Sequence, residues 1–422
     1  MEKTLKAELN SPVTADNPHL SREHIAAIEQ GFTQAINREN TFAEKYDLRQ
    51  RLFGTDDVLP MWVADMDLPT PPFIIETLQQ RLEHLVLGYN LMPETLYQSI
   101  IDWQAQHHYV VQGSHIRFTH NVANGFFMAV QAFSQAGDGV LVMPPIYPPF
   151  LNAPQANGRQ TIEVPLVLNN ERYEMDFAAI ETAIKKFHVK LLLFCNPQNP
   201  SGRVWSKEEL QQLAEICLRH NVVILSDEIH SDLTFAPHQH IPMASLSEDI
   251  AQQTITLSSP GKTFNLGGLQ VGYAIIDNPQ LRKQYTQICQ QNSIHDLNTF
   301  ALHATISAYS QQGREYLPLL KQHLQNNIQT FSGFLSEHYP KVNVMQPQAG
   351  YLVWLDFSEM FDNQQELKAW LINDCKLGLN DGLSFGEVGK GYMRINLAVS
   401  TKTLQQAIQR MQKTLLQCNS VS

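Results

Sequence analysis

The chain has 422 residues, of which 43% are hydrophobic and 17% charged, so it can bury the cores of two or three domains. Its net charge of −11 argues against nucleic-acid binding, because contact with a phosphate backbone requires clustered Lys and Arg. No apolar run approaches the roughly 20 residues of a membrane helix, and the start lacks the apolar core of a secretory signal, so we expect a cytoplasmic protein without membrane contact.

The cysteines and paired histidines predict no metal site. The five cysteines are odd in number, scattered and without a Cys-x-x-Cys pair, which is typical of reduced thiols. His107-His108 and His238-Gln239-His240 have no acidic or Cys partner at ligand spacing in the sequence. We therefore interpret them as loop histidines.

The first elements along the chain are helices. Ser21 to Ile36 is typical of a helix that Ser21 caps, although the function of residues 1–36 is unreadable. Thr70-Pro71-Pro72 predicts the start of a helix through His84, since proline is tolerated in a first turn. Asn121 then suits the N-cap of a further helix. Such a helix start can hold a phosphate with its unpaired N–H groups, and a plain helix start is the alternative.

Three apolar runs in the middle of the chain are typical of buried parallel strands. They are Val189–Cys195, Val222–Leu225 and Thr254–Leu257. Between the first two, Ser206-Lys207-Glu208-Glu209 is a capping box that predicts a helix to His220. Strands and helices alternate in this way through Ile276, as a mainly parallel sheet requires.

Each of these strands ends near a polar side chain: Asn199, Asp227 and Lys262. Ligands bind outside the carboxyl ends of strands in doubly wound sheets, so we expect the three to meet around one ligand. Pyridoxal phosphate would use a lysine for its aldehyde, a carboxylate for its ring nitrogen and an anion site for its phosphate. A lysine sheltered from water loses proton affinity and can attack the aldehyde.

The alternatives for these residues are ordinary ones. Lys262 on its own segment is about as well explained as a surface lysine after a strand, and Asp227 as the cap of the following turn. Ser259, three residues before the lysine, can add a hydroxyl to the phosphate, or it can be a solvated loop serine.

The order of elements changes past about Ser310. A long polar helical stretch leads to Tyr351–Asp356 and then to Gly391–Asn396. This order predicts a separate small α+β domain, joined by the amino-terminal segment through Asp67.

From about Asn37 to Ala398 the chain resembles the MalY/PatB group of pyridoxal-phosphate C–S lyases, best known for cystathionine β-lyase activity, within the class I/II aminotransferase superfamily. The matching segments are Pro60–Asp67, Gly88-Tyr89, Pro144–Phe150, Asn196–Gly202, Ser226–Asp232, Lys262–Asn265 and Tyr392–Ala398. The Asn-Pro and Lys segments indicate the superfamily, whereas Trp-Val-Ala-Asp-Met-Asp and Asp-Glu-Ile-His-Ser-Asp indicate the lyase branch. Gln270, where many aminotransferases carry a phosphate-binding arginine, also favours a lyase.

The resemblance implies an α/β protein of pyridoxal-phosphate fold type I. A large domain, residues 71–310, would hold a mainly parallel mixed sheet sandwiched by helices. A smaller α+β domain would be built from both chain ends, residues 37–70 and 311–422, with residues 1–36 as an extension.

The resemblance also assigns cofactor contacts. The backbone at Val122 and Ala123 would hold the phosphate, Tyr147 would stack on the ring and His230 would lie beside the ring's phenolic oxygen. Tyr89 would reach across a homodimer interface to the partner's phosphate. Residue by residue, ordinary packing remains the alternative for Tyr147 and a structural imidazole for His230.

Three further positions are implied for the amino-acid substrate. Arg394 would clamp its α-carboxylate through a bidentate fork, which lysine cannot form. Asn199 would touch the same carboxylate and the phenolic oxygen, and the backbone at Ala64 would close over it.

The expected reaction is α,β-elimination. Lys262 would remove the Cα proton of an L-cysteine S-conjugate such as cystathionine, and loss of the thiol would lead to pyruvate and ammonia. An aminotransferase shares the early steps and is the alternative. A regulatory protein-binding role is a third possibility, since some relatives are thought to act in this way.

Overall fold

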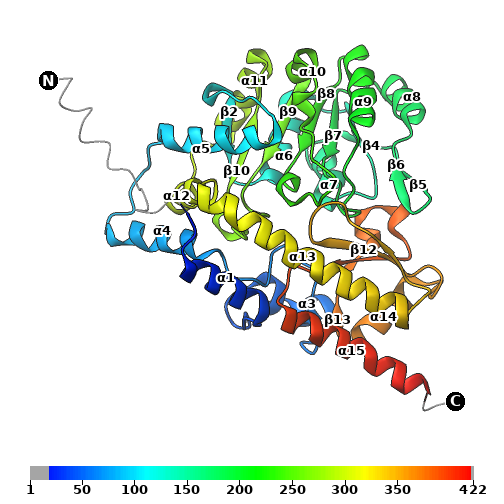
Figure 1. The fold of residues 1–422 in the computed structure, drawn as a ribbon. Coiled ribbons are helices and arrows are strands. Elements are labelled where there is room, and N and C mark those ends of the chain that lie inside the picture. The colour runs from blue at the N-terminus through cyan, green and yellow to red at the C-terminus, as the bar shows by residue number, and fades with distance from the viewer. Residues whose placement is uncertain (1–18, 420–422) are drawn as a thin grey trace.

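The computed structural model describes residues 19–419, and their side chains through Leu415. Two sheets organise this part of the chain, one of seven strands and one of four. Figure 1 places the seven-stranded sheet and its helices in the upper half, and the smaller sheet with both ends of the described chain in the lower half.

The large sheet has the order β2-β10-β9-β8-β7-β3-β4. Its strands are β2 (Ile116–Thr119), β3 (Gly139–Val142), β4 (Gln160–Glu163), β7 (Leu191–Cys195), β8 (Val223–Asp227), β9 (Thr254–Ser258) and β10 (Gly272–Ile275). All neighbours are parallel except β10, which is antiparallel to both β9 and β2. This confirms the predicted mainly parallel mixed sheet. The central strands are apolar because both of their faces are covered.

Helices cover both faces of this sheet. The helices of this lobe are α4 (Pro72–Glu83), α5 (Glu94–Gln104), α6 (Val122–Phe133), α7 (Pro148–Ala156), α8 (Phe177–Phe187), α9 (Lys207–Arg219), α10 (Glu248–Gln253), α11 (Pro279–Gln291) and α12 (Thr299–Ala308). Of these, α4 and α5 pack against α12. One buried cluster lies between the sheet and α6, α7 and α11, and another between the sheet and α8 and α9. The predicted N-caps are confirmed, since Asn121 accepts from Asn124 N and Ser206 forms a capping box with Glu209.

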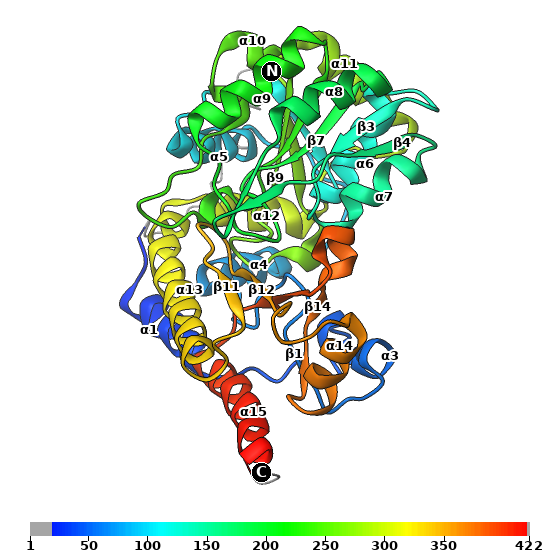
Figure 2. The same cartoon turned by 90° about the vertical axis from the view of Figure 1, so that its right-hand side faces the viewer.

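The small sheet is antiparallel, with the order β11-β12-β15-β14. Its strands are β11 (Asn343–Met345), β12 (Leu352–Asp356), β14 (Asn380–Asp381) and β15 (Tyr392–Asn396). The accompanying helices are α13 (Gln311–His338), α14 (Gln364–Asn373) and α15 (Thr401–Asn419). Figure 2 shows α13 running along this lobe beside β11. A separate hairpin pairs β5 (Val167–Asn169) with β6 (Arg172–Glu174).

The amino-terminal segment crosses into the small lobe. It forms α1 (Arg22–Thr33), α2 (Glu44–Asp47), α3 (Arg49–Phe53) and β1 (Leu59–Pro60). Ser21 caps α1 as expected, and α1 contacts both α4 and α15. Strand β1 pairs in parallel with β13 (Leu377–Gly378), and Asp67 bridges to Val399. The division of the chain into domains at residues 36, 70 and 310 stays a prediction, and residues 1–18 of the expected extension lie outside the described residues.

In residues 19–419 no helix has both the length and the apolar character needed to cross a membrane. Four cysteines, Cys195, Cys217, Cys289 and Cys375, are buried free thiols. The side chain of the fifth, Cys418, lies outside the described part.

Candidate active site

A cavity of about 740 Å³ opens beyond the carboxyl ends of β8 and β9, and most of the predicted site residues line it. They are Ala64, Val122, Ala123, Tyr147, Asn199, Asp227, His230, Ser259 and Lys262. The volume lies within the range typical of cofactor sites. Strands from distant parts of the chain thus deliver one set of polar groups to a common space, as the switch-point rule for α/β sheets predicts.

Lys262 lies in the loop that follows β9, and its amine donates to the main-chain carbonyl of Ala64 at 2.7 Å. Burial, and then the positive charge of Arg394, lower the pKa of Lys262 to about 8, against the opposing charges of Asp65 and Asp227. At pH 7 about a tenth of this amine is therefore neutral and nucleophilic, whereas an exposed lysine, with a pKa of about 10.4, is almost entirely charged.

Asp227 is the last residue of β8 and is buried. Its Oδ1 accepts from the main-chain N–H of Ile229 at 3.1 Å, so the predicted turn cap is present. Burial raises the pKa of Asp227 to about 7 even though that hydrogen bond and Lys262 oppose the shift. A carboxyl that is costly to ionise without a close cation suits the protonated ring nitrogen of pyridoxal phosphate.

The amino end of α6 forms one side of the cavity through Val122 and Ala123. Next to it, Asn121 Nδ2 donates to Gln270 Oε1 at 2.6 Å, so Gln270 sits at this end. The hydroxyl of Ser259 donates to Val271 O at 2.7 Å and accepts from Gly261 N at 2.9 Å. Because a hydroxyl has a single proton, Ser259 has to release Val271 O before it can donate to a phosphate.

The two predicted ring neighbours are both largely buried. Burial raises the pKa of Tyr147, which lies just before α7. Burial, followed by the charges of Lys262 and Arg394, lowers the pKa of His230 to about 3. His230 is therefore neutral at physiological pH and can be a hydrogen-bond donor without adding a charge.

Arg394 comes from β15 of the small sheet and is buried. Its Nη1 donates to Asn199 Oδ1 at 3.0 Å and its Nη2 to Trp62 O at 3.2 Å. Its Nε is buried without a hydrogen-bond partner, and burial lowers the pKa of the guanidinium to about 10. A buried cation with an unused donor fits an anionic group of a ligand.

The structure adds residues that the sequence reasoning missed. Tyr351 donates through its hydroxyl to Ala64 O at 2.8 Å, and Asn396 Nδ2 donates to Val63 O and Asp65 O at 2.5 and 2.6 Å. Asn396 belongs to the Tyr392–Ala398 segment, and Asp65 to the Trp-Val-Ala-Asp-Met-Asp segment. Their position in segments that resemble a known family was the only signal in the sequence that could have identified them as site residues.

Tyr89 is absent from the cavity of its own chain and is fully exposed. It lies between α4 and α5, where Leu85, Val86 and Leu87 are exposed as well. Large apolar patches on a protein surface are typical of interaction sites.

The paired histidines have the acidic partners that the spacing in the sequence did not reveal. His107 Nε2 is 3.1 Å from Asp232 Oδ1, and the buried His240 Nε2 is 2.9 Å from Glu228 Oε2. His240 lies in a loop, as interpreted, and the fold adds a contact with Glu228 that its spacing in the sequence does not indicate. Among the described residues no group of three or more such side chains could hold a metal ion.

This fold, with a partly buried lysine and a buried aspartate in one cavity, defines a pyridoxal-phosphate-dependent protein of fold type I. Residues 64–411 match the family Aminotransferase class I and II, and the chain belongs to it. Within that family it belongs to the group that contains PatB and MalY.

Three relatives illustrate the similarity. Cystathionine beta-lyase PatB of Bacillus subtilis (strain 168) is 40% identical over 91% of this chain and 99% of its own. Protein MalY of Escherichia coli (strain K12) is 31% identical over 89% of this chain and 96% of its own. The crystal structure of cystalysin from Treponema denticola, which contains pyridoxal 5'-phosphate, superposes with a TM-score of 0.88 at 32% identity, over 92% of this chain and 99% of its own.

Proposed function

We propose that this protein is a pyridoxal-phosphate-dependent carbon–sulfur β-lyase that converts L-cystathionine or related L-cysteine S-conjugates into a thiol, pyruvate and ammonia. The observation that supports it most is the 40% identity to PatB, a cystathionine beta-lyase, over nearly the whole of both chains. The cavity that joins Lys262, Asp227 and Asn199 supplies the groups that this chemistry requires.

The cofactor, when bound, supplies an electron sink for the bond broken at Cα. The Lys262 amine is the base that takes the Cα proton, and a pKa of about 8 suits a proton transfer near neutral pH. The same amine, once protonated, can return that proton to the departing sulfur. Asp227, as a carboxylate, holds the proton on the ring nitrogen, which maintains the sink.

Groups from both lobes orient the substrate. Arg394 and Asn199, joined at 3.0 Å, bind the α-carboxylate, and the backbone at Ala64 closes over it. With its Oδ1 engaged by Arg394, Asn199 has its Nδ2 left to donate to the phenolic oxygen of the ring. His230 lies beside that oxygen as a neutral imidazole.

The remaining cofactor contacts belong to the large lobe. The N–H groups at Val122 and Ala123 and the hydroxyl of Ser259 bind the phosphate at the amino end of α6. Tyr147 stacks on the ring face, where burial removes it from water.

The active unit in this proposal is a homodimer. Tyr89 completes the phosphate site of the neighbouring subunit, and its full exposure beside Leu85, Val86 and Leu87 supports an interface there. The buried free thiols Cys195, Cys217, Cys289 and Cys375 support a reducing, cytoplasmic location.

One assay separates this function from its main alternative. The purified protein, loaded with pyridoxal phosphate, is incubated with L-cystathionine, and pyruvate and free thiol are measured with and without an added 2-oxo acid. We expect pyruvate and thiol in equal amounts without the 2-oxo acid. Transfer of the amino group to the 2-oxo acid with no pyruvate would identify an aminotransferase and overturn the lyase proposal.

A further inference from the structure

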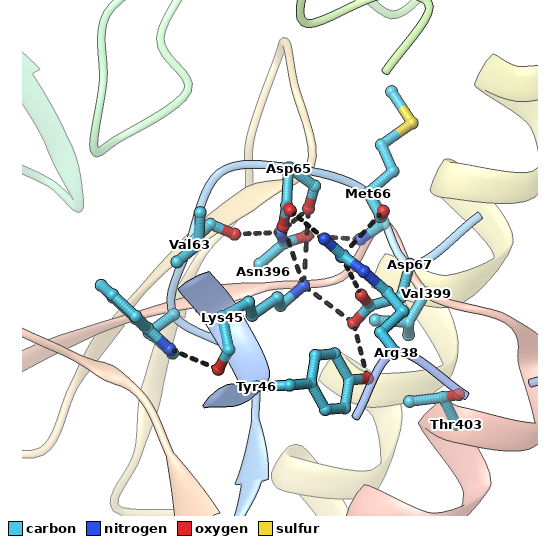
Figure 3. Close-up of polar contacts among 12 residues, drawn as sticks. Arg38, Lys45, Tyr46, Val63, Asp65, Met66, Asp67, Asn396, Val399 and Thr403 are labelled. Atoms are coloured by element: carbon cyan, nitrogen blue, oxygen red, sulfur yellow. Dashed lines mark hydrogen bonds and ion pairs between the residues drawn. The ribbon is translucent and has the colours of Figure 1, made fainter. Parts of the chain in front are cut away.

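Four charged side chains form a cluster behind the loop that lines the active site (Figure 3). Lys45 Nζ is 2.8 Å from Asp67 Oδ2 and 3.5 Å from Asp65 Oδ1. Arg38 reaches the same two carboxylates, with its Nη2 at 2.6 Å from Asp65 and its Nη1 at 2.6 Å from Asp67. Tyr46 adds a hydrogen bond to Asp67 at 3.2 Å. We call Arg38, Lys45, Asp65 and Asp67 the clamp.

The clamp is buried at one end and open at the other. The side chains of Lys45 and Asp67 are 0% and 2% exposed, whereas those of Arg38 and Asp65 are 23% and 29% exposed. Burying an ion pair costs several kcal/mol of desolvation per ion, and its attraction often does no more than offset this cost. Stability alone is therefore a weak explanation for a lysine without any exposed surface, and a positional role is the better hypothesis for it.

The clamp forms hydrogen bonds with one side of the Trp62–Asp67 loop. Arg38 Nη1 donates to Met66 O and Lys45 Nζ to Asp65 O, both at 3.4 Å. Trp62 Nε1 donates in return to Lys45 O at 3.1 Å. Figure 3 shows Lys45 and Arg38 pointing toward the two carboxylates from the amino-terminal segment.

The other side of the same loop contacts the candidate active site. Ala64 O accepts from the Lys262 amine at 2.7 Å, and Trp62 O accepts from Arg394 at 3.2 Å. Consequently, a displacement of this backbone moves the two groups that bind and deprotonate a substrate. Misplacement of a reacting group by about 1 Å can cost roughly a hundredfold in rate.

Charge connects the clamp to Lys262 as well. Asp65 lines the cavity, and one of its oxygens, Oδ1, is buried without a hydrogen-bond partner. Burial and Arg394 lower the pKa of Lys262, whereas Asp65 and Asp227 raise it. Two further polar groups of the site, His230 and the Tyr351 hydroxyl, are uncharged near neutral pH.

We propose that Arg38 and Lys45 are positioning residues of the reaction: they hold the Trp62–Asp67 loop against Lys262 and Arg394, and they partly neutralise Asp65 so that its charge does not keep the Lys262 nitrogen protonated. The inference rests on the proposed function for its catalytic consequence only. The electrostatic part concerns Lys262 and its cofactor and needs no substrate.

Three variants of the cofactor-loaded protein test the proposal: Lys45→Met, Arg38→Gln and Asp65→Asn. The readout is the pH midpoint of the visible absorbance of the Lys262–cofactor linkage, together with kcat for L-cystathionine at each variant's optimum pH. Removing a cation leaves Asp65 less neutralised, so we expect the midpoint to rise by about half a unit in Lys45→Met and Arg38→Gln. Removing the anion in Asp65→Asn lowers it by about one unit.

We also expect kcat to fall roughly tenfold to a hundredfold in Lys45→Met and Arg38→Gln. Lys185→Met is the matched control, because it breaks another lysine–carboxylate pair, with Glu181 at 3.1 Å, on α8, a helix that contributes no residue to the cavity. Both of its readouts should equal those of wild type. If Lys45→Met does not fold, the test uses Arg38→Gln and Asp65→Asn, whose side chains are partly exposed.

Three outcomes would each overturn the proposal. The first is a set of pH midpoints equal to that of wild type, and the second is a shift in the same direction for Lys45→Met and Asp65→Asn. The third is an unchanged kcat in Arg38→Gln. A protein that shows opposite midpoint shifts but no lyase turnover would refute the proposed function and leave the electrostatic part standing.

Discussion

The amine of Lys262 lies 2.7 Å from the main-chain carbonyl oxygen of Ala64, a residue 198 positions earlier in the chain. Tyr351 of the small lobe donates to the same oxygen at 2.8 Å. The base of the proposed reaction is thus held by a loop from the amino-terminal segment, and that loop is held by the small sheet. The proposed sites of cofactor attachment and substrate binding are therefore linked through one backbone segment.

The first prediction concerns Lys262 itself. Lys262→Ala removes both the covalent attachment of the cofactor and the base, so we expect at least about a thousandfold loss of kcat for L-cystathionine. The visible absorbance of the Lys262–cofactor linkage should disappear in the same variant. Absorbance spectra and pyruvate release measure the two effects.

Lys262→Ala also distinguishes catalysis from a protein-binding role. The side chain is enclosed in the cavity, so its truncation leaves the outer surface of the molecule unchanged. A partner interaction that survives in this variant would be independent of the chemistry. Retention of more than a tenth of wild-type pyruvate release would show that another group is the base.

The second prediction uses Asp227 in the cofactor-free protein. Burial raises the pKa of this carboxyl to about 7, whereas an unfolded aspartate titrates near 4. Between these pH values the folded state binds more protons than the unfolded state, so the stability falls as pH rises through this window. The Asp227→Asn variant carries a neutral amide at every pH and escapes this loss.

We therefore expect Asp227→Asn to match wild type in stability below about pH 4 and to exceed it above pH 7, by a few kcal/mol. Denaturant unfolding of both cofactor-free proteins between pH 4 and 8 measures the difference. With pyridoxal phosphate bound the order should reverse, because the ring nitrogen then pairs with the carboxylate. A stability difference that does not change with pH would contradict the assignment of a buried, costly charge.

Much of the site was predictable because it depends on buried strands. The apolar runs that predicted β7, β8 and β9 are enclosed on both faces, so their bounds agree with the structure to within two residues. Asp227 and Lys262 follow from those strands, since the carboxyl ends of parallel strands share one edge.

The tertiary contacts of the amino-terminal segment were not predictable in the same way. Lys45 looks like a surface lysine in its local sequence, and only tertiary packing encloses it against Asp67. The hydrogen bond from Tyr351 to Ala64 likewise depends on how the small sheet docks, and no periodicity encodes that docking.

The third prediction concerns the geometry of Arg394. Lysine at this position keeps the positive charge but cannot donate to Asn199 and Trp62 and still present a second N–H to a carboxylate. Because hydrogen bonds to charged groups contribute about 1.5–3 kcal/mol, Arg394→Lys should lower kcat/KM roughly tenfold to a hundredfold, mainly through KM. Steady-state kinetics with L-cystathionine measure both constants. A loss confined to kcat with an unchanged KM would argue against binding of the substrate carboxylate.

The last prediction tests whether the active site is shared between subunits. Tyr89→Ala and Lys262→Ala should each have low activity when tested alone, since both residues have a role in the proposed site. Tyr89 lies outside its own chain's cavity, whereas Lys262 lies inside it. In a hybrid dimer, the subunit with the native lysine receives the native tyrosine from its partner, which restores one complete site. Random mixing after dissociation makes about half of the dimers hybrid, so the mixture should regain about a quarter of wild-type activity. If Tyr89 acted within its own chain, every site would lack one residue and the mixture would gain nothing over the separate variants. The gain on mixing, measured as pyruvate release against unmixed controls treated in the same way, therefore reports the shared site directly.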